Sequence, residues 1–327
     1  MKRIFQIVLL IGVCCSCKDD KIFDLSPTER TAKRIHELRA ELINAPYGWS
    51  VTYFPRMDSL LFSNVNELIT IPQFGFQREY GYGGHCFLMK FSSNGTVEAL
   101  ADYSKQSLTT VQQSEFEVKQ NRFTQLSFTT YNYLHSLVNN RFAGSSDFLY
   151  TGKDIDGNLV FKTTSYVEPA REYIVFTKLK EEKGWPESIL EAYDNKSFFK
   201  SMSKPRLVIR KAGHVYFLSD MPMESSQRYH LFLSIAYFAP RGWTKEVVSG
   251  LGSGYVGTAE GLTFRPGIRY SKNYTFYDFK REGNKFVCEL VKRFDPYSKA
   301  EHWVSKHLFP DGEETGVVAE IWNDPAI

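Results

Sequence analysis

Three of the five cysteines lie together near the start of the chain, in the stretch VCCSCKDDKIF at residues 13–23. Acylation of a thiol is the chemistry that this pattern favours. The apolar run 4–13 follows two basic residues and is shorter than the ~20 residues of a membrane-crossing helix, which is typical of a secretory signal. In a lipoprotein signal a small residue precedes the acylated cysteine, and Ser16 precedes Cys17. We predict that residues 1–16 are a lipoprotein signal peptide and that Cys17 carries the lipid.

The residues after Cys17 form an acidic tether, residues 17–25. Its sequence CKDD resembles the export signal that directs lipoproteins of Bacteroidota to the cell surface. Several acyl chains on one cysteine would give stable anchoring, since one chain alone binds a membrane only weakly. Residues 18–25 span at most about 28 Å, so we expect the folded body close to its membrane. The alternatives to lipidation at Cys17 are acylation of Cys15 and an ordinary cleaved signal. The alternative to an export signal is a charged tether that is only solvated.

A second stretch has the residue types of a binding site. The sequence FGFQREYGYGGH at 74–85 mixes four aromatic residues with four glycines. Tyrosine rings bring a large contact area at little cost in rotamer entropy, and an arginine forms strong hydrogen bonds to polar ligands. We predict ligand contacts from Arg78, Tyr80 and Tyr82, with Trp49 nearby. The alternative is that these rings cover the sheet and that Trp49 belongs to the core.

Other motifs do not support catalysis. The stretch GSGYVG at 252–257 matches GxGxxG, but a strand-like segment follows it in place of the helix that a dinucleotide site needs; we interpret it as a flexible loop. Residues 154–158 are similar to a calcium loop with its glycine too early, so we predict a hairpin turn there. The chain lacks HExxH, GxSxG and P-loop patterns. We therefore predict no catalytic residue, no cofactor and no metal.

The overall composition and net charge limit the fold classes and the partners to be expected. The 327 residues are 43% hydrophobic, 24% charged and 15% aromatic, with a net charge of +3. This composition is that of a globular protein, and its aromatic content favours strands. A net charge so near zero creates no positive electrostatic field that would attract nucleic acid. We therefore do not expect nucleic acid as a partner.

Helix signals occur at two places. Ser26 and Glu29 form a capping box with a proline at the first helical position, which predicts a helix over 27–43. A second helix is predicted at 186–200, between two sets of strands at 48–180 and 205–291.

Four dipeptides, Asn94-Gly95, Asp156-Gly157, Ala212-Gly213 and Gly283-Asn284, separate strand-like runs. Such pairs favour the positive φ angles of tight hairpins. The predicted fold is mainly β, with antiparallel meanders in two lipocalin-like sheet or barrel units. The first unit is predicted over 26–180 with the N-terminal helix, and the second over 181–327 with a helical start and an irregular tail from Arg293.

Cys86 and Cys288 lie in strand-like runs far from the signal. An oxidising compartment permits a disulfide between them, while buried free thiols are also common in such runs. We favour two unpaired core cysteines.

Several stretches together resemble one family. They are the lipobox with its acidic tether, SPTER, PYGWSVTYFP, YGGHCFLMKFSSNGTV, LSFTTYNYLH, DFLYTGKDIDGNLVFKT and GTAEGLTFRPGIRY. They resemble an uncharacterised family of Bacteroidota surface lipoproteins, domain-of-unknown-function family 4302. Its members are usually encoded beside SusC/SusD-like uptake systems, so the resemblance implies a role in nutrient capture.

The expected protein is a cell-surface, outer-membrane lipoprotein that binds a glycan or peptide for a TonB-dependent transporter. Its expected partners are the membrane, through the lipid, and SusC/SusD-like components. A surface hydrolase and a structural subunit that contacts partner proteins are the two alternatives. A carboxylate pair in an aromatic-lined cleft would favour the hydrolase, and a flat apolar patch would favour the structural subunit.

Overall fold

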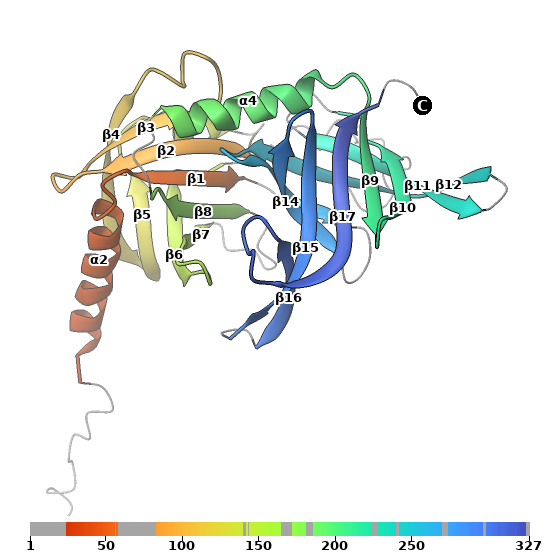
Figure 1. The fold of residues 1–327 in the computed structure, drawn as a ribbon. Coiled ribbons are helices and arrows are strands. Elements are labelled where there is room, and N and C mark those ends of the chain that lie inside the picture. The colour runs from red at the N-terminus through yellow and green to blue at the C-terminus, as the bar shows by residue number, and fades with distance from the viewer. Residues whose placement is uncertain are drawn as a thin grey trace, which may run out of the picture.

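The computed structural model describes residues 24–55, 57, 83–139, 142, 144–164, 172–180, 186–223, 228–239, 242–269, 274–296 and 299–324. Side chains of residues 228–252 are outside this description. The chain is mainly β, and its described residues form two antiparallel sheets with two α-helices (Figure 1). The predicted fold class is confirmed. Within the described residues, no helix is both long enough and apolar enough to cross a membrane.

The first sheet is a closed barrel of eight strands in sequence order, with β1 paired to β8. Its strands are β1 Trp49–Phe54, β2 His85–Phe91, β3 Thr96–Ala101, β4 Gln112–Asn121, β5 Phe123–Phe128, β6 Asp147–Lys153, β7 Leu159–Thr163 and β8 Tyr173–Lys178. A short 3-10 helix, η3 Tyr133–Leu137, lies between β5 and β6. The predicted hairpins at Asn94-Gly95 and Asp156-Gly157 join β2 to β3 and β6 to β7.

Aromatic rings fill the barrel. Trp49, Phe87, Phe148 and Phe176 are buried with at most 1% of their surface exposed, and they belong to one continuous core. Rings pack edge to face, as Tyr53 does on Phe148 with centroids 5.4 Å apart. Such packing adds to the hydrophobic stabilisation of each ring. The barrel interior is therefore a packed core.

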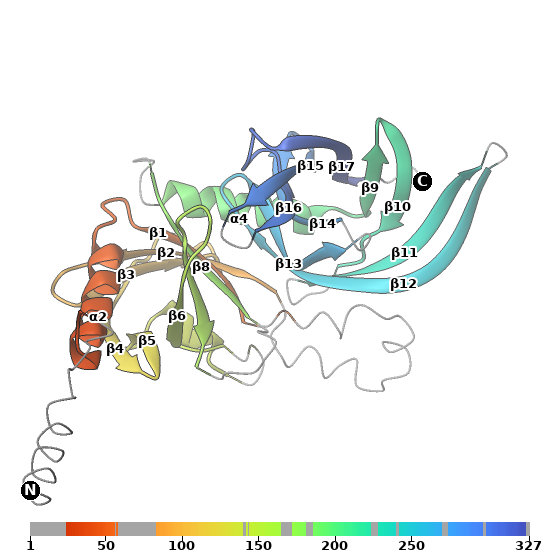
Figure 2. The same ribbon diagram turned by 90° about the horizontal axis from the view of Figure 1, so that it is seen from below.

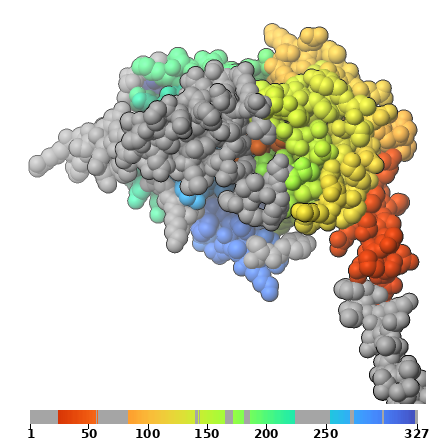
Figure 3. Space-filling view, turned by 180° about the vertical axis from the view of Figure 1, so that it is seen from behind, coloured from red at the N-terminus to blue at the C-terminus, as the bar shows by residue number. Residues whose placement is uncertain are grey.

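The N-terminal helix, α2 Pro27–Ile43, closes one end of the barrel. It begins with the predicted capping box, in which Ser26 and Glu29 exchange hydrogen bonds. Leu38 and Leu42 are buried in the barrel core, and the indole N–H of Trp49 donates to the Leu42 carbonyl at 2.9 Å. The first turns of the helix are exposed and project from the barrel (Figure 3).

The second sheet has nine strands and curls into a half-barrel in the order β10-β9-β17-β15-β14-β13-β12-β11, with β16 paired to β15. These are β9 Pro205–Lys211, β10 His214–Asp220, β11 Arg228–Ala239, β12 Gly242–Gly257, β13 Gly261–Arg269, β14 Thr275–Glu282, β15 Lys285–Asp295, β16 Ala300–Ser305 and β17 Glu313–Asn323. The pair β11–β12 extends away from the rest of the sheet (Figure 2).

Two predictions for this half of the chain are wrong. The tail after Arg293 is not irregular, since β17 pairs with both β9 and β15 in the middle of the sheet. The glycine stretch 252–257 is not a loop but part of β12. Its last glycine lies so close to the helix α4 Glu187–Ser201 that an added Cβ would be 1.9 Å from the Ala192 carbonyl oxygen. The glycine is needed for helix–strand contact.

Helix α4 joins the two sheets. On one side Asn195 donates through its amide to the carbonyl oxygens of Thr258 and Ala259, at 2.9 and 3.3 Å. On the other side Lys196 reaches the barrel and donates to Asp102, which follows β3. A second contact comes from Arg265 of β13, whose guanidinium lies 4.5 Å from the ring of Tyr173 in β8. Polar and aromatic contacts thus hold the barrel against the second sheet.

Candidate functional site

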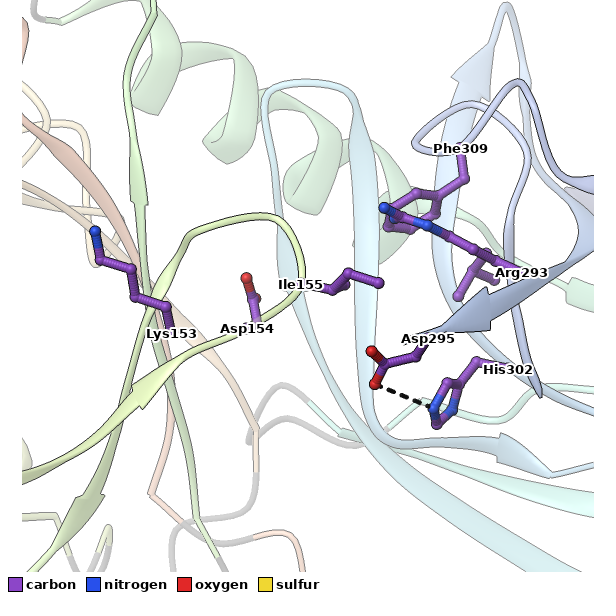
Figure 4. A pocket seen from close by; sticks show the side chains of 8 residues that line it. Lys153, Asp154, Ile155, Arg293, Asp295, His302 and Phe309 are labelled. Carbon is purple, nitrogen blue, oxygen red and sulfur yellow. Dashed lines mark ion pairs between the residues drawn. The ribbon is translucent and has the colours of Figure 1, made fainter. Parts of the chain in front are cut away.

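A cleft of about 320 Å³ lies where the barrel meets the second sheet. We call it the junction cleft (Figure 4). The β6–β7 hairpin of the barrel forms one wall, and β15, β16 and the segment after β16 form the other. Its lining residues are Lys153, Asp154, Ile155, Arg293, Asp295, His302, Val304 and Phe309. Polar groups and apolar surface therefore meet in one concavity, as in small-molecule sites generally.

Arg293 and Phe309 form a flat layer on one wall. The Arg293 guanidinium carbon lies 4.1 Å from the centroid of the Phe309 ring, a cation–π contact. Ile155 and Val304 add aliphatic surface to the same cleft. Stacked planar groups beside aliphatic side chains suit a ligand that has a ring with an apolar face.

Each basic side chain that lines the junction cleft lies against an acidic one. Arg293 donates through Nη1 to Oδ1 of Asp156 at 3.1 Å, and this contact bridges the two walls. The other two pairs are His302 Nε2 with Asp295 Oδ2 at 3.7 Å and Lys153 Nζ with Glu41 Oε2 at 3.1 Å. Because Arg293 and Lys153 each have a carboxylate partner within the protein, neither presents an uncompensated positive charge to the cleft.

Asp154 is occupied by the hairpin turn. Its Oδ1 accepts the backbone N–H groups of Asp156 and Asn158, and its Oδ2 accepts the Asn158 amide, all at 2.9 Å. The prediction of a hairpin turn at 154–158 is confirmed. Burial and the neighbouring Asp154 raise the pKa of the Asp156 carboxyl above its usual value. Asp154 and Asp295 both line the cleft, but each already has a partner within the protein.

A second group of reactive side chains is buried between the barrel and α4. Lys196 Nζ lies 2.6 Å from Asp102 Oδ2, and His85 Nδ1 lies 4.0 Å from Asp102 Oδ1. All three residues are at most 4% exposed. Burial lowers the pKa of His85 to about 4, while the charges of Asp102 and Lys196 act on it in opposite directions. His85 is therefore a neutral imidazole at neutral pH.

The two remaining cysteines are buried and unpaired. They belong to different apolar clusters, Cys86 beside Phe54 and Cys288 in the core of the second sheet. Burial raises the pKa of each thiol to about 12, so both stay protonated and poorly nucleophilic.

Of the four residues predicted to bind a ligand, the structure describes Trp49 alone. Trp49 lies in the barrel core with 0% of its surface exposed, which is the packing alternative for this residue. Arg78, Tyr80 and Tyr82 lie outside the described residues, as does the predicted anchor Cys17. Trp49 is not among the described residues that line the junction cleft.

Sequence reasoning missed the junction cleft because its walls are far apart along the chain. Arg293 and Asp156 are separated by 137 positions. One signal was available in the tail, where Val317, Ala319 and Ile321 alternate with exposed or half-buried residues. That alternation predicts a strand, and with it an ordered wall at Arg293. In the described ranges, no group of three or more His, Cys, Asp or Glu side chains is arranged to hold a metal ion.

Of the comparisons with known proteins, the one with protein-family models gives a match. A search of curated proteins finds no match. The model of a domain of unknown function, DUF4302, matches residues 19–283. The match includes the whole barrel, α4 and the second sheet as far as the turn before β15. The chain belongs to the DUF4302 family.

Proposed function

We propose that the protein is a lipid-anchored surface protein of the outer membrane that binds a glycan in the junction cleft. It performs no catalysis on this ligand and serves as an accessory of a TonB-dependent uptake system of the SusC/SusD-like kind. The lipid on Cys17 is its contact with the membrane. The Lys-Asp-Asp sequence after the lipidated cysteine supports exposure to the cell exterior.

The observation that carries the proposal is the lining of the junction cleft. A sugar ring has one apolar face and a rim of hydroxyl groups. The Arg293–Phe309 layer suits the face, and the polar groups of Asp295, His302 and Lys153 suit the uncharged rim. A charged ligand would have to compete with the partners that Arg293 and Lys153 already have within the protein.

The arrangement supports binding better than hydrolysis. A glycoside hydrolase needs one carboxyl group as general acid and a second as base or nucleophile. Asp154 and Asp295 are the two carboxylates among the described lining residues, and three hydrogen bonds hold Asp154 in its turn. A carboxylate held in place by three hydrogen bonds within its own turn is not free to turn toward a ligand.

The test compares Phe309→Ala with Phe294→Ala. Phe309 lines the cleft, whereas Phe294 is 60% exposed and is not among the lining residues. Retention is measured by native electrophoresis through gels that contain neutral polysaccharides, with a casein digest as competitor. Loss of the ring should weaken retention by about tenfold or more, because aromatic anchors dominate such contacts.

Equal retention of both variants on every polysaccharide that holds the wild type would contradict a site at the junction cleft. Loss of the protein's retention on every polysaccharide when the casein digest is added would assign a peptide in place of a glycan.

A further inference from the structure

The buried group at α4 has the parts of a condensation reaction. The Lys196 amine lies 2.6 Å from both the backbone oxygen and Oδ2 of Asp102. Its contact with Oδ2 places the nucleophilic nitrogen next to the carboxyl carbon. Two reacting groups that the fold holds in contact are spared most of the entropy cost of a bimolecular step.

The Lys196–Asp102 pair is shielded from solvent. Asp102 is 0% exposed and Lys196 4%, and the Tyr193 ring lies 5.6 Å from the Lys196 amine. Ala192 and Val256 are buried members of an adjacent apolar cluster. Where water is excluded, an ion pair loses much of its advantage over the neutral amine and acid, and hydrolysis of an amide product is prevented.

Two polar atoms beside the pair are unsatisfied. Within the described part of the chain, neither His85 Nδ1 nor Asp102 Oδ1 has a hydrogen-bond partner. They face each other at 4.0 Å, so a shift of about 1 Å brings them to hydrogen-bond distance. The His85 ring is held edge-on between Tyr103 and Phe142, with centroids 5.4 and 5.5 Å away. An unpaired buried polar group in a native structure calls for an explanation.

We propose that Lys196 and Asp102 condense to an intramolecular isopeptide bond, with His85 as the proton relay. Lys196 Nζ first gives up one ammonium proton, and the neutral amine then attacks Cγ of Asp102 to form a C–N bond. Two of the three ammonium protons are passed through the His85 imidazole to Oδ1, which leaves as water when its bond to Cγ breaks. Oδ2 remains as the amide carbonyl oxygen. Nothing is oxidised or reduced, and the two charges disappear together.

The bond would join α4 to the barrel. Asp102 follows β3 and Lys196 lies in the middle of α4, 94 positions later. The amide would replace a buried ion pair, which is costly to keep desolvated, with a neutral and covalent link. It would hold the two walls of the junction cleft on one framework.

The experiment is a tryptic digest of the purified full-length protein, read by mass spectrometry. Trypsin does not cleave after an acylated lysine, so the peptide 91–105 should appear joined to the peptide 184–200. The joined species should have the sum of the two masses less one water molecule. Fragmentation should place the link at Asp102 and Lys196.

Lys196→Arg is the matched variant, because it keeps the positive charge but cannot form this amide. It should yield separate peptides, cleaved after residue 196. Lys200→Arg, on the exposed surface of the same helix, should leave the joined species unchanged. In His85→Gln the joined species should form on the order of 100-fold more slowly after refolding, the usual effect of losing a general acid–base.

Separate peptides with their full masses in the wild type would overturn the isopeptide bond, and the folding of any variant does not affect that result. A joined species that forms at the wild-type rate in His85→Gln would overturn the assignment of the relay.

Discussion

His85 illustrates how burial of a single residue sets the pH response of the protein. Its ring has 4% of its surface exposed, lies between two aromatic rings and faces Asp102, with Lys196 on the other side of that carboxylate. Its pKa is lowered from 6.5 to about 4, chiefly by burial, with Asp102 raising the pKa and Lys196 lowering it. The folded protein therefore keeps His85 neutral under conditions that protonate it in the unfolded chain.

This shift predicts a loss of stability in mild acid. The folded pKa lies below the unfolded value, so the contribution of His85 is fully present above pH 6.5 and is lost as the pH falls toward 4. The pKa difference corresponds to a loss of ~3 kcal/mol. Urea unfolding measured at intervals from pH 7.5 to 4.5 checks this.

The control is His85→Gln, compared with the wild type at the same content of the proposed amide, so that only the imidazole differs. Its unfolding free energy should fall less steeply over the same range than that of the wild type. Parallel curves for the two proteins would show that another group causes the acid sensitivity.

Local sequence patterns were sufficient to predict the local structure at several residues. The Ser26–Glu29 capping box depends on neighbours three positions apart and is present as predicted. Ala212 and Gly213 have φ angles of 48° and 81°, as a two-residue hairpin requires. Trp49 was harder to place, because an aromatic residue that follows a helix has the same local pattern whether it closes a barrel or contacts a ligand.

At the scale of elements, strand pairing between distant segments limits prediction. Strand β17 lies between β9 and β15, so its neighbours come from residues 205–211 and 285–295. The short sequence of the tail contains the alternation of a strand but not the identity of its partners. The junction cleft depends on that pairing, since Arg293 belongs to β15.

The close contact between α4 and β12 requires a glycine at position 257, because there is no room for a Cβ there. The Gly257 backbone approaches Ala192 so closely that a Cβ would overlap its carbonyl oxygen at 1.9 Å. We predict that Gly257→Ala forces the helix away from the sheet and lowers the free energy of unfolding by ~3 kcal/mol, as overpacking does. Thermal and urea unfolding at neutral pH measure this loss.

Gly213→Ala is the comparison, since an added Cβ there meets nothing within 4 Å. That variant loses only the ~1 kcal/mol of a positive φ angle at a non-glycine residue. Equal losses for the two variants would mean that α4 does not pack closely on Gly257.

At the scale of the whole molecule, α2 separates the body from the segment that carries the predicted anchor. Its 17 residues correspond to about 25 Å of helix, and the part before Leu38 is largely exposed. A lipid on Cys17 would thus lie beyond both the tether and this exposed helix. In that arrangement the distance between barrel and membrane is set by the helix as well as by the tether.

The proposed anchor leads to the last prediction. Cys17→Ser should abolish labelling by palmitate, because the acylated thiol is lost, and should leave the protein unprocessed or soluble. Cys15→Ser is the matched control and should label normally. Replacing Lys18, Asp19 and Asp20 with alanine should preserve the lipid but hide the protein from a protease added to intact cells. Labelling that persists in Cys17→Ser and vanishes in Cys15→Ser would move the anchor to Cys15. Continued cleavage of the triple variant on intact cells would show that this acidic stretch does not direct the protein to the surface.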